Sequence, residues 1–322
     1  MKPDVLFADY YDDWVKTYKV GAVRPVTLVK YFNFGRHLRN IAPDVKMIDV
    51  DKKMYQQVIN RFAESHAKNT VLDFHNCIKS SILDALDEGV IIKNPVLRVV
   101  IKGQPTKQYN KYLGAIEAGL LLQKLDLTLP IVRPYEIQHS RAQEFTTNWD
   151  WLIFLCLGTG IRYSEALGLT TADFDFSNKM MRINKTFDYK ISSKLVKDTK
   201  SKSSERFISI DNKIAQKFSE ALAGFDPDAL IFIPEGQRVF NSTANSRLKT
   251  LCKQCGIPKI GIHALRHTHA SLLLYSGISI NAISRRLGHA KVSITQDVYL
   301  HIIKELEEKD NHAIAHTMEA LY

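Results

Sequence analysis

Apolar and polar positions in the first hundred residues alternate with the period of an α-helix. Apolar side chains recur at three- and four-residue spacing in four successive stretches, near 7–18, 28–41, 54–62 and 71–86. Gly89 and the pair Asn94-Pro95 then favour an end to helical structure. The pattern predicts a helical domain over residues 1–104, followed by a polar linker at 105–112.

The pattern becomes mixed after the linker. Helical periodicity near 113–126 and an apolar run near 149–157 precede two alternating segments typical of strands, at 180–188 and 206–210. A loop rich in Lys and Ser, 190–204, separates these segments, and the chain from about 211 reads as mostly helical. The predicted fold class is mainly α with a small antiparallel β-sheet (α+β). The second domain is expected over 113–322, with a tail from about 301.

Composition and charge narrow the class of function. Hydrophobic residues make up 45% of the 322 residues and charged residues 24%, which excludes a disordered or fibrous chain. Four cysteines in this length do not form a disulfide framework, and the chain shows no membrane-spanning stretch and no export leader, so we expect a cytoplasmic protein. The net charge is +10, and residues 179–206 hold nine Lys or Arg against three Asp or Glu. This field suits a polyanion such as nucleic acid.

A histidine and an arginine lie at the start of a predicted helix near residue 262. His263 and Arg266 share a face close to the helix N-terminus, where free backbone N–H groups favour an anion. His263 and His267 also have the spacing of zinc ligands, but no Glu accompanies them and Arg266 would repel a cation. A phosphate site is therefore favoured over a metal site. We expect His267 and His269 to pack or to bond locally.

Three further features are weak when taken singly. Arg162 follows the turn Gly158-Thr-Gly160, and Glu165 is placed to hold Arg162 or to cap a short helix. Gly288-His289 is followed ten residues later by Tyr299, and a tyrosine at helical spacing is more often a core residue than a nucleophile. An ordinary surface ion pair and a core tyrosine remain the plain alternatives.

The order of these features is more specific than any one of them. Arg162, a lysine in the basic loop, His263-x-x-Arg266, Gly288-His289 and Tyr299 follow one another as in the tyrosine recombinase (phage integrase) family, which the sequence resembles over almost its whole length. The resemblance is to integrases of phages and integrative elements of low-GC Gram-positive bacteria. Many of those carry a small arm-site-binding domain before this region, so either this member lacks it or the chain has been truncated.

The resemblance implies a core-site DNA-binding domain, a catalytic domain and a role for each matched residue. Tyr299 would attack the DNA phosphate to give a 3′-phosphotyrosine, while Arg162 and Arg266 bind the non-bridging oxygens. His263 and His289 would bond to the phosphate, and His263 could accept the tyrosine proton. Lys200 would be the general acid, with Lys202 as the alternative, and Glu165 would orient Arg162. The reaction needs neither a cofactor nor a metal.

The resemblance also implies partners. These are double-stranded DNA with specific attachment sites, a homotetramer on that DNA, and DNA-bending accessory proteins, with no membrane. Expected contacts to the DNA backbone, with a merely solvated surface as the alternative for each, are Arg24, Lys30, Arg36, Arg39, Lys79, Lys202 and Arg247. Two alternative functions are DNA relaxation of the type IB topoisomerase kind and a non-catalytic DNA-binding regulator, although a pure binder has no need for Tyr299.

Overall fold

The computed structural model divides into two compact units, Met1–Gln108 and Tyr109–Tyr322. It describes residues 4–105, 112–128, 131, 145–189, 196–198, 205–233, 239–299 and 302. Most of these residues are helical, and they include a small antiparallel sheet. The predicted fold class is therefore confirmed.

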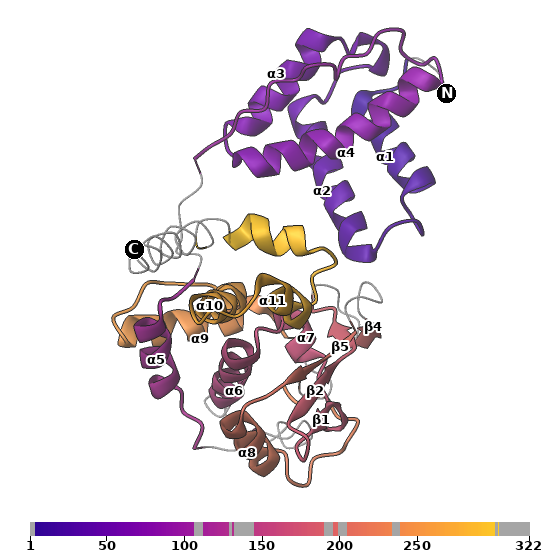
Figure 1. The fold of residues 1–322 in the computed structure, drawn as a ribbon. Helices are drawn as coiled ribbons and strands as arrows, with labels where there is room; N and C mark the ends of the chain where they lie inside the picture. Colours follow the sequence, from indigo (N-terminus) through magenta and orange to yellow (C-terminus); the bar gives the residue numbers. More distant parts are fainter. Residues whose placement is uncertain are drawn as a thin grey trace, which may run out of the picture. The chain divides into compact units, whose positions relative to one another are not determined.

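Unit 1 is helical over its described part (Figure 1). Its elements are α1 (Phe7–Tyr18), α2 (Pro25–Ile41), the 3-10 turn η1 (Met47–Asp49), α3 (Lys52–Ala63) and α4 (Lys68–Asp87). Most of the apolar positions that predicted these helices form one core, in which the rings of Phe62 and Phe74 stack with centroids 4.1 Å apart. The buried indole of Trp14 in α1 donates to Asp84 in α4 at 2.5 Å, which joins the first and last helices.

Unit 2 is organised around an apolar helix. Its helices are α5 (Ala115–Lys124), α6 (Phe145–Thr159), α7 (Tyr163–Leu167), α8 (Asn212–Ala221), α9 (Asn241–Gln254), α10 (Ile262–Tyr275) and α11 (Ile280–Leu287), and residues 292–299 are also helical. Every residue from 148 to 157 in α6 is buried, and α6 packs against α7, α9 and α10 (Figure 1). This uninterrupted burial explains why α6 reads as an apolar run rather than as an amphipathic stripe.

The sheet of unit 2 differs from the prediction. The expected strand at 180–188 is two strands, β2 (Met180–Ile183) and β3 (Lys185–Phe187), and they belong to different sheets. β2 lies between β1 (Phe174–Asp175) and β5 (Arg206–Ser209), whereas β3 pairs with β4 (Val196–Asp198). The strand breaks at Asn184 because the partner changes there. β4 lies inside the segment that the sequence analysis assigned to a loop, so that assignment was wrong at 196–198.

None of the helices in the described ranges is both long and apolar enough to cross a lipid bilayer.

Candidate active site

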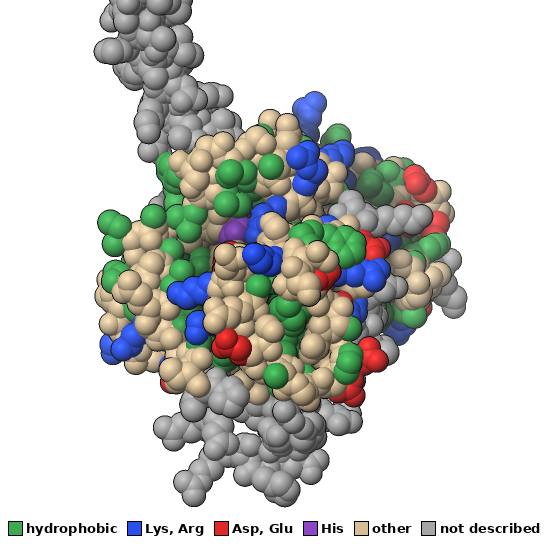
Figure 2. Space-filling view, turned by 60° about the horizontal axis from the view of Figure 1, so that its bottom comes forward, with side chains coloured by type: hydrophobic (Ala, Val, Ile, Leu, Met, Phe, Trp, Pro, Cys, Tyr) green, Lys and Arg blue, Asp and Glu red, His purple; other side chains and the backbone are tan. Residues whose placement is uncertain are grey.

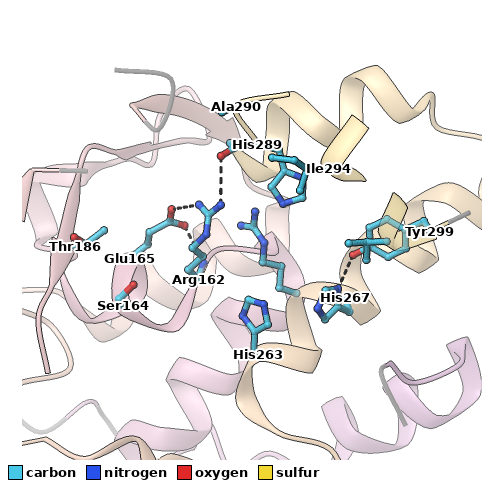
Figure 3. Close-up of a pocket in the computed structure, with 13 residues that line it drawn as sticks. Arg162, Ser164, Glu165, Thr186, His263, His267, His289, Ala290, Ile294 and Tyr299 are labelled. Atoms are coloured by element: carbon cyan, nitrogen blue, oxygen red, sulfur yellow. Dashed lines mark hydrogen bonds and ion pairs between the residues drawn. The ribbon is translucent and has the colours of Figure 1, made fainter. Parts of the chain in front are cut away.

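Basic side chains gather around a histidine near the middle of the face shown in Figure 2. Unit 2 contains a pocket of about 510 Å³ whose lining comes from α7, β3, α10, the turn after α11 and the helical segment 292–299 (Figure 3). The lining residues are Arg162, Ser164, Glu165, Thr186, His263, Arg266, His267, Gly288, His289, Ala290, Ile294, Val298 and Tyr299. The pocket thus brings together five of the six residues expected to be catalytic. The sixth, Lys200, lies outside the described residues, as does Lys202.

Arg162 reaches the pocket because the chain turns sharply after α6. Gly160 has a left-handed backbone with φ +73°, and a Cβ there would lie 2.6 Å from the ring of His269, so both conformation and space require glycine. Arg162 is the N-cap of α7, and its backbone N–H donates to Glu165 Oε2 at 2.8 Å. Its guanidinium Nη1 donates to Glu165 Oε1 at 2.8 Å. The predicted contact of Glu165 with Arg162 is confirmed.

Glu165 also holds a second arginine that the sequence analysis missed. The carboxylate is 1% exposed, and Arg206 from β5 donates to its two oxygens at 3.2 and 2.9 Å. Burial alone would raise the pKa of Glu165, but the hydrogen bonds and charges of Arg206 and Arg162 bring it below its ordinary value. One signal was available: Arg206 alternates in phase with Ile208, which places the arginine on the buried face of its strand.

The C-terminus of α11 anchors three arginines. The consecutive carbonyl oxygens of Arg286, Leu287 and Gly288 accept from Arg206 Nε at 2.7 Å, Arg266 Nη2 at 2.6 Å and Arg162 Nη2 at 3.4 Å. The last carbonyls of a helix lack intrahelical partners and carry the negative end of its dipole, which favours cations. Gly288 ends the helix with φ +66°, and a Cβ at that position would lie 2.8 Å from Arg206.

The pocket wall carries excess positive charge. Burial, followed by the charge of Arg162, lowers the pKa of Arg266 to about 9, a value at which the guanidinium still holds its proton at pH 7. Arg266 also donates to the carbonyl oxygen of Gly160 at 3.0 Å, so its side chain is held from two sides. The described lining contains two arginines but only one carboxylate, that of Glu165. The pocket therefore suits an anion such as a phosphodiester.

Two histidines of the lining are kept neutral. Burial and the nearby arginines lower the pKa of His289 to about 4, and they also lower the pKa of His263. His289 Nδ1 lies 2.6 Å from the hydroxyl of Thr295, which fixes the orientation of the ring. A neutral imidazole still has one N–H to donate. Both rings can therefore bond to a phosphate oxygen at neutral pH.

Tyr299 closes one side of the pocket. It is 2% exposed and belongs to a small apolar cluster with Leu274, Ile283 and Leu287. Its hydroxyl lies 3.0 Å from Nδ1 of His267, and burial raises the pKa of Tyr299 to about 12. We expected His267 to pack or to bond locally, but it lines the pocket and contacts Tyr299. The available signal was its position one helical turn after His263, on the same face of α10.

Several residues expected to contact DNA have partners within the protein. Arg247 donates to both oxygens of Asp150, which is fully buried, at 2.7 and 2.6 Å. At the surface of unit 1, Lys30 forms an ion pair with Asp73, and Arg39 forms ion pairs with Asp9 and Asp12. Arg36 bonds to Asn33. Arg24 is the N-cap of α2, and Lys79 is half-buried. Contact of these residues with DNA stays a prediction.

The comparisons with known proteins agree with the geometry. The family model described as the phage integrase family matches residues 137–305, which is more than half of the chain. This chain belongs to the phage integrase family. It is accordingly a tyrosine-type site-specific recombinase, an enzyme that breaks and rejoins DNA.

Individual relatives span different parts of this integrase. The tyrosine recombinase XerC-like protein of Caldanaerobacter subterraneus subsp. tengcongensis is 25% identical, over 93% of this chain and 80% of its own length. The integrase of Staphylococcus phage L54a is 34% identical, over 47% of this chain and 48% of its own. Two groups of solved structures share the fold. The Tn1549 transposon integrase in complex with transposon right end DNA has a TM-score of 0.72 at 20% identity, covering 92% of this chain and 95% of that one. The structure of a lambda integrase dimer bound to a core site has a TM-score of 0.65 at 15% identity, and the match covers 91% of this chain and 77% of that one.

Proposed function

We propose that this integrase cleaves and rejoins double-stranded DNA at specific attachment sites, with Tyr299 as the nucleophile. The observation that carries the proposal is one pocket that holds Tyr299 together with Arg162, Arg266 and two neutral histidines. The Tyr299 oxygen forms a bond to the DNA phosphorus while the bond from phosphorus to the 5′ oxygen breaks. The products are a 3′-phosphotyrosine and a free 5′-hydroxyl.

The residues of the pocket divide the work of this step. Arg162 and Arg266 bind the two non-bridging oxygens, where a guanidinium fork stabilises the charge that builds up on the phosphorane. His263 and His289 add hydrogen bonds to the same oxygens, and a histidine of α10 accepts the proton that the Tyr299 hydroxyl loses. Glu165 is a positioning residue, because its carboxylate fixes both the backbone and the guanidinium of Arg162. Lys200 protonates the leaving 5′ oxygen, with Lys202 as the alternative.

The covalent intermediate makes the reaction reversible without an energy source. The phosphotyrosine retains the energy of the phosphodiester, so a 5′-hydroxyl can attack it and restore the DNA backbone. Exchange of the attacking strand between two sites turns cleavage and rejoining into recombination. No cofactor is required in this scheme.

The partners follow from the chemistry and the charge. The Tn1549 and lambda integrases of the comparison are bound to DNA, and the net charge of +10 favours the same partner here. We assign residues 1–104 to core-site binding, 105–112 to the linker and 113–322 to catalysis. We further propose a homotetramer on two DNA sites, helped by DNA-bending proteins, in which the tail from about 301 docks on a neighbouring protomer. Apart from Ile302, which is buried in the cluster of Tyr299, this tail lies outside the described residues. Access to bacterial DNA requires a cytoplasmic location.

The proposal is tested by mapping covalent protein–DNA adducts on the DNA that flanks the native gene. The expected result is two cleavages at a fixed spacing on opposite strands, each with protein on the 3′ phosphate and a free 5′-hydroxyl. Adducts on 5′ phosphates, or adducts scattered without a preferred sequence, would contradict site-specific recombination by this route.

A further inference from the structure

The hydroxyl of Tyr299 has a specific partner in the pocket. His267 Nδ1 lies 3.0 Å from it, although the two residues are 32 positions apart in the chain. The rings meet edge to face with centroids 6.0 Å apart. This distance is within the range over which a base can take a proton directly from a hydroxyl.

The surroundings of Tyr299 make that partner important. The ring is packed among apolar side chains and is almost fully buried, so water has little access to the phenol. Burial also raises the pKa of Tyr299 to about 12, which means that the oxygen carries its proton until a base removes it. The attacking oxygen therefore needs a proton acceptor that is already in contact with it.

His263, the residue first considered for this task, stands one step further away. Its ring packs edge to face against His267, with centroids 5.0 Å apart, and Figure 3 shows His267 between His263 and Tyr299. His263 is the second residue of α10 and lines the same pocket as Arg162 and Arg266. This arrangement leaves His263 free to bond to the phosphate while its neighbour serves the nucleophile.

We propose that His267 holds the Tyr299 hydroxyl in place and accepts its proton when the tyrosine attacks; this inference rests on the proposed function. The proton moves from the Tyr299 oxygen to His267 Nδ1 as the oxygen bonds to phosphorus. The 5′ oxygen leaves with a proton from the general acid. On rejoining, His267 returns its proton to the departing tyrosine oxygen. The negative charge of the bound phosphate offsets Arg266 and stabilises the imidazolium formed in between.

The test separates the tyrosine step from the rest of the site. Cleavage is measured with a nicked suicide substrate that traps the covalent adduct. Joining is measured with a DNA strand that ends in a 3′-p-nitrophenyl phosphate, which a 5′-hydroxyl strand attacks with release of p-nitrophenol. This leaving group needs no proton and replaces Tyr299, so the joining reaction uses the arginines and the phosphate-binding histidines but not the acceptor of the tyrosine proton.

His267→Leu should cleave at least about 100-fold more slowly than wild type, yet join the p-nitrophenyl strand within about threefold of it. Tyr299→Phe is the matched control, because it should lose cleavage and still join the p-nitrophenyl strand. Arg266→Ala should lose both reactions. His267→Asn retains an oxygen acceptor but no base, so its cleavage should stay at least about tenfold below wild type.

Three results would overturn the inference. Wild-type cleavage by His267→Leu would remove His267 from the step, and equal loss of both reactions would make its role structural. Full recovery in His267→Asn would exclude proton transfer. Failure of the wild-type protein to form any adduct would instead contradict the proposed function, so the two failures are distinguishable.

Discussion

Loss of Glu165 should show how much more a buried ion pair contributes to the free energy of unfolding than an exposed one. Its carboxylate is 1% exposed and pairs with Arg206, whose side chain is 7% exposed, and with Arg162, whose side chain is 33% exposed. Removing one partner of a buried pair costs about 3–5 kcal/mol, and the exposed share of Arg162 adds little. Since Gln retains one oxygen acceptor, Glu165→Gln should lose about 3 kcal/mol of unfolding free energy, and the Tm should fall by about 6–12 °C.

The neighbouring acid provides a matched control. Glu205 pairs with Arg182 at 2.7 Å, but both side chains are about half exposed, so Glu205→Gln should cost under about 1 kcal/mol. Thermal unfolding of both variants at pH 7 is the assay. The pKa of Glu165 is lowered in the folded state, so its contribution is present above the unfolded pKa, near 4.3, and is lost as the pH falls through the folded value. Equal melting temperatures for the two variants at pH 7 would refute this reasoning.

Three other perturbations test the site. Gly288→Ala and Gly256→Ala both place alanine at a φ near +66°, at a cost of about 1–2 kcal/mol each, but only at Gly288 does the Cβ meet Arg206. We expect only Gly288→Ala to slow cleavage, and we expect it to unfold about 1–3 kcal/mol more easily than Gly256→Ala, as measured by urea titration. Burial lowers the pKa of His269 to about 4. Its contribution to the free energy of unfolding should therefore be constant above pH 6.5 and fall by up to about 3 kcal/mol between pH 6.5 and 4. An identical pH dependence of stability in His269→Gln would contradict this. Lys200→Ala should slow cleavage about 10²–10⁴-fold and recover on DNA with sulfur at the 5′-bridging position, whereas Arg162→Ala should not recover; rescue of Lys202→Ala instead would move the general acid by two residues.

The helices could be predicted because their signal is local. The apolar positions of α1 to α4 repeat at helical spacing within each segment, and the same positions form the core of unit 1. The β-structure was harder because a strand depends on partners elsewhere in the chain. The alternating sequence pattern continues through Asn184. The strand is nevertheless broken there, because β2 pairs with β5 only as far as Arg206 and the next strand, β3, pairs with β4 instead.

The candidate site could be predicted for those residues whose order along the chain matches a family pattern. Arg162, His263, Arg266, His289 and Tyr299 occur in a family pattern and meet in one pocket. The supporting contacts were not predictable in the same way. The bonds of Arg206 to Glu165 and of His267 to Tyr299 join segments that are 41 and 32 residues apart. The sequence placed Arg206 on the buried face of its strand and His267 on the face of His263, but only the folded chain reveals which residue each one holds.

Recombination by this route requires that Tyr299 become covalently joined to DNA. The most direct measurement is to incubate the wild-type protein and Tyr299→Phe with a nicked suicide substrate, digest the adduct with protease and identify the modified peptide by mass spectrometry. We expect a 3′-phosphate adduct on Tyr299 in the wild-type protein. Tyr299→Phe should bind the same DNA with unchanged affinity and form no adduct. An adduct on any other residue, or one that persists in Tyr299→Phe, would contradict it.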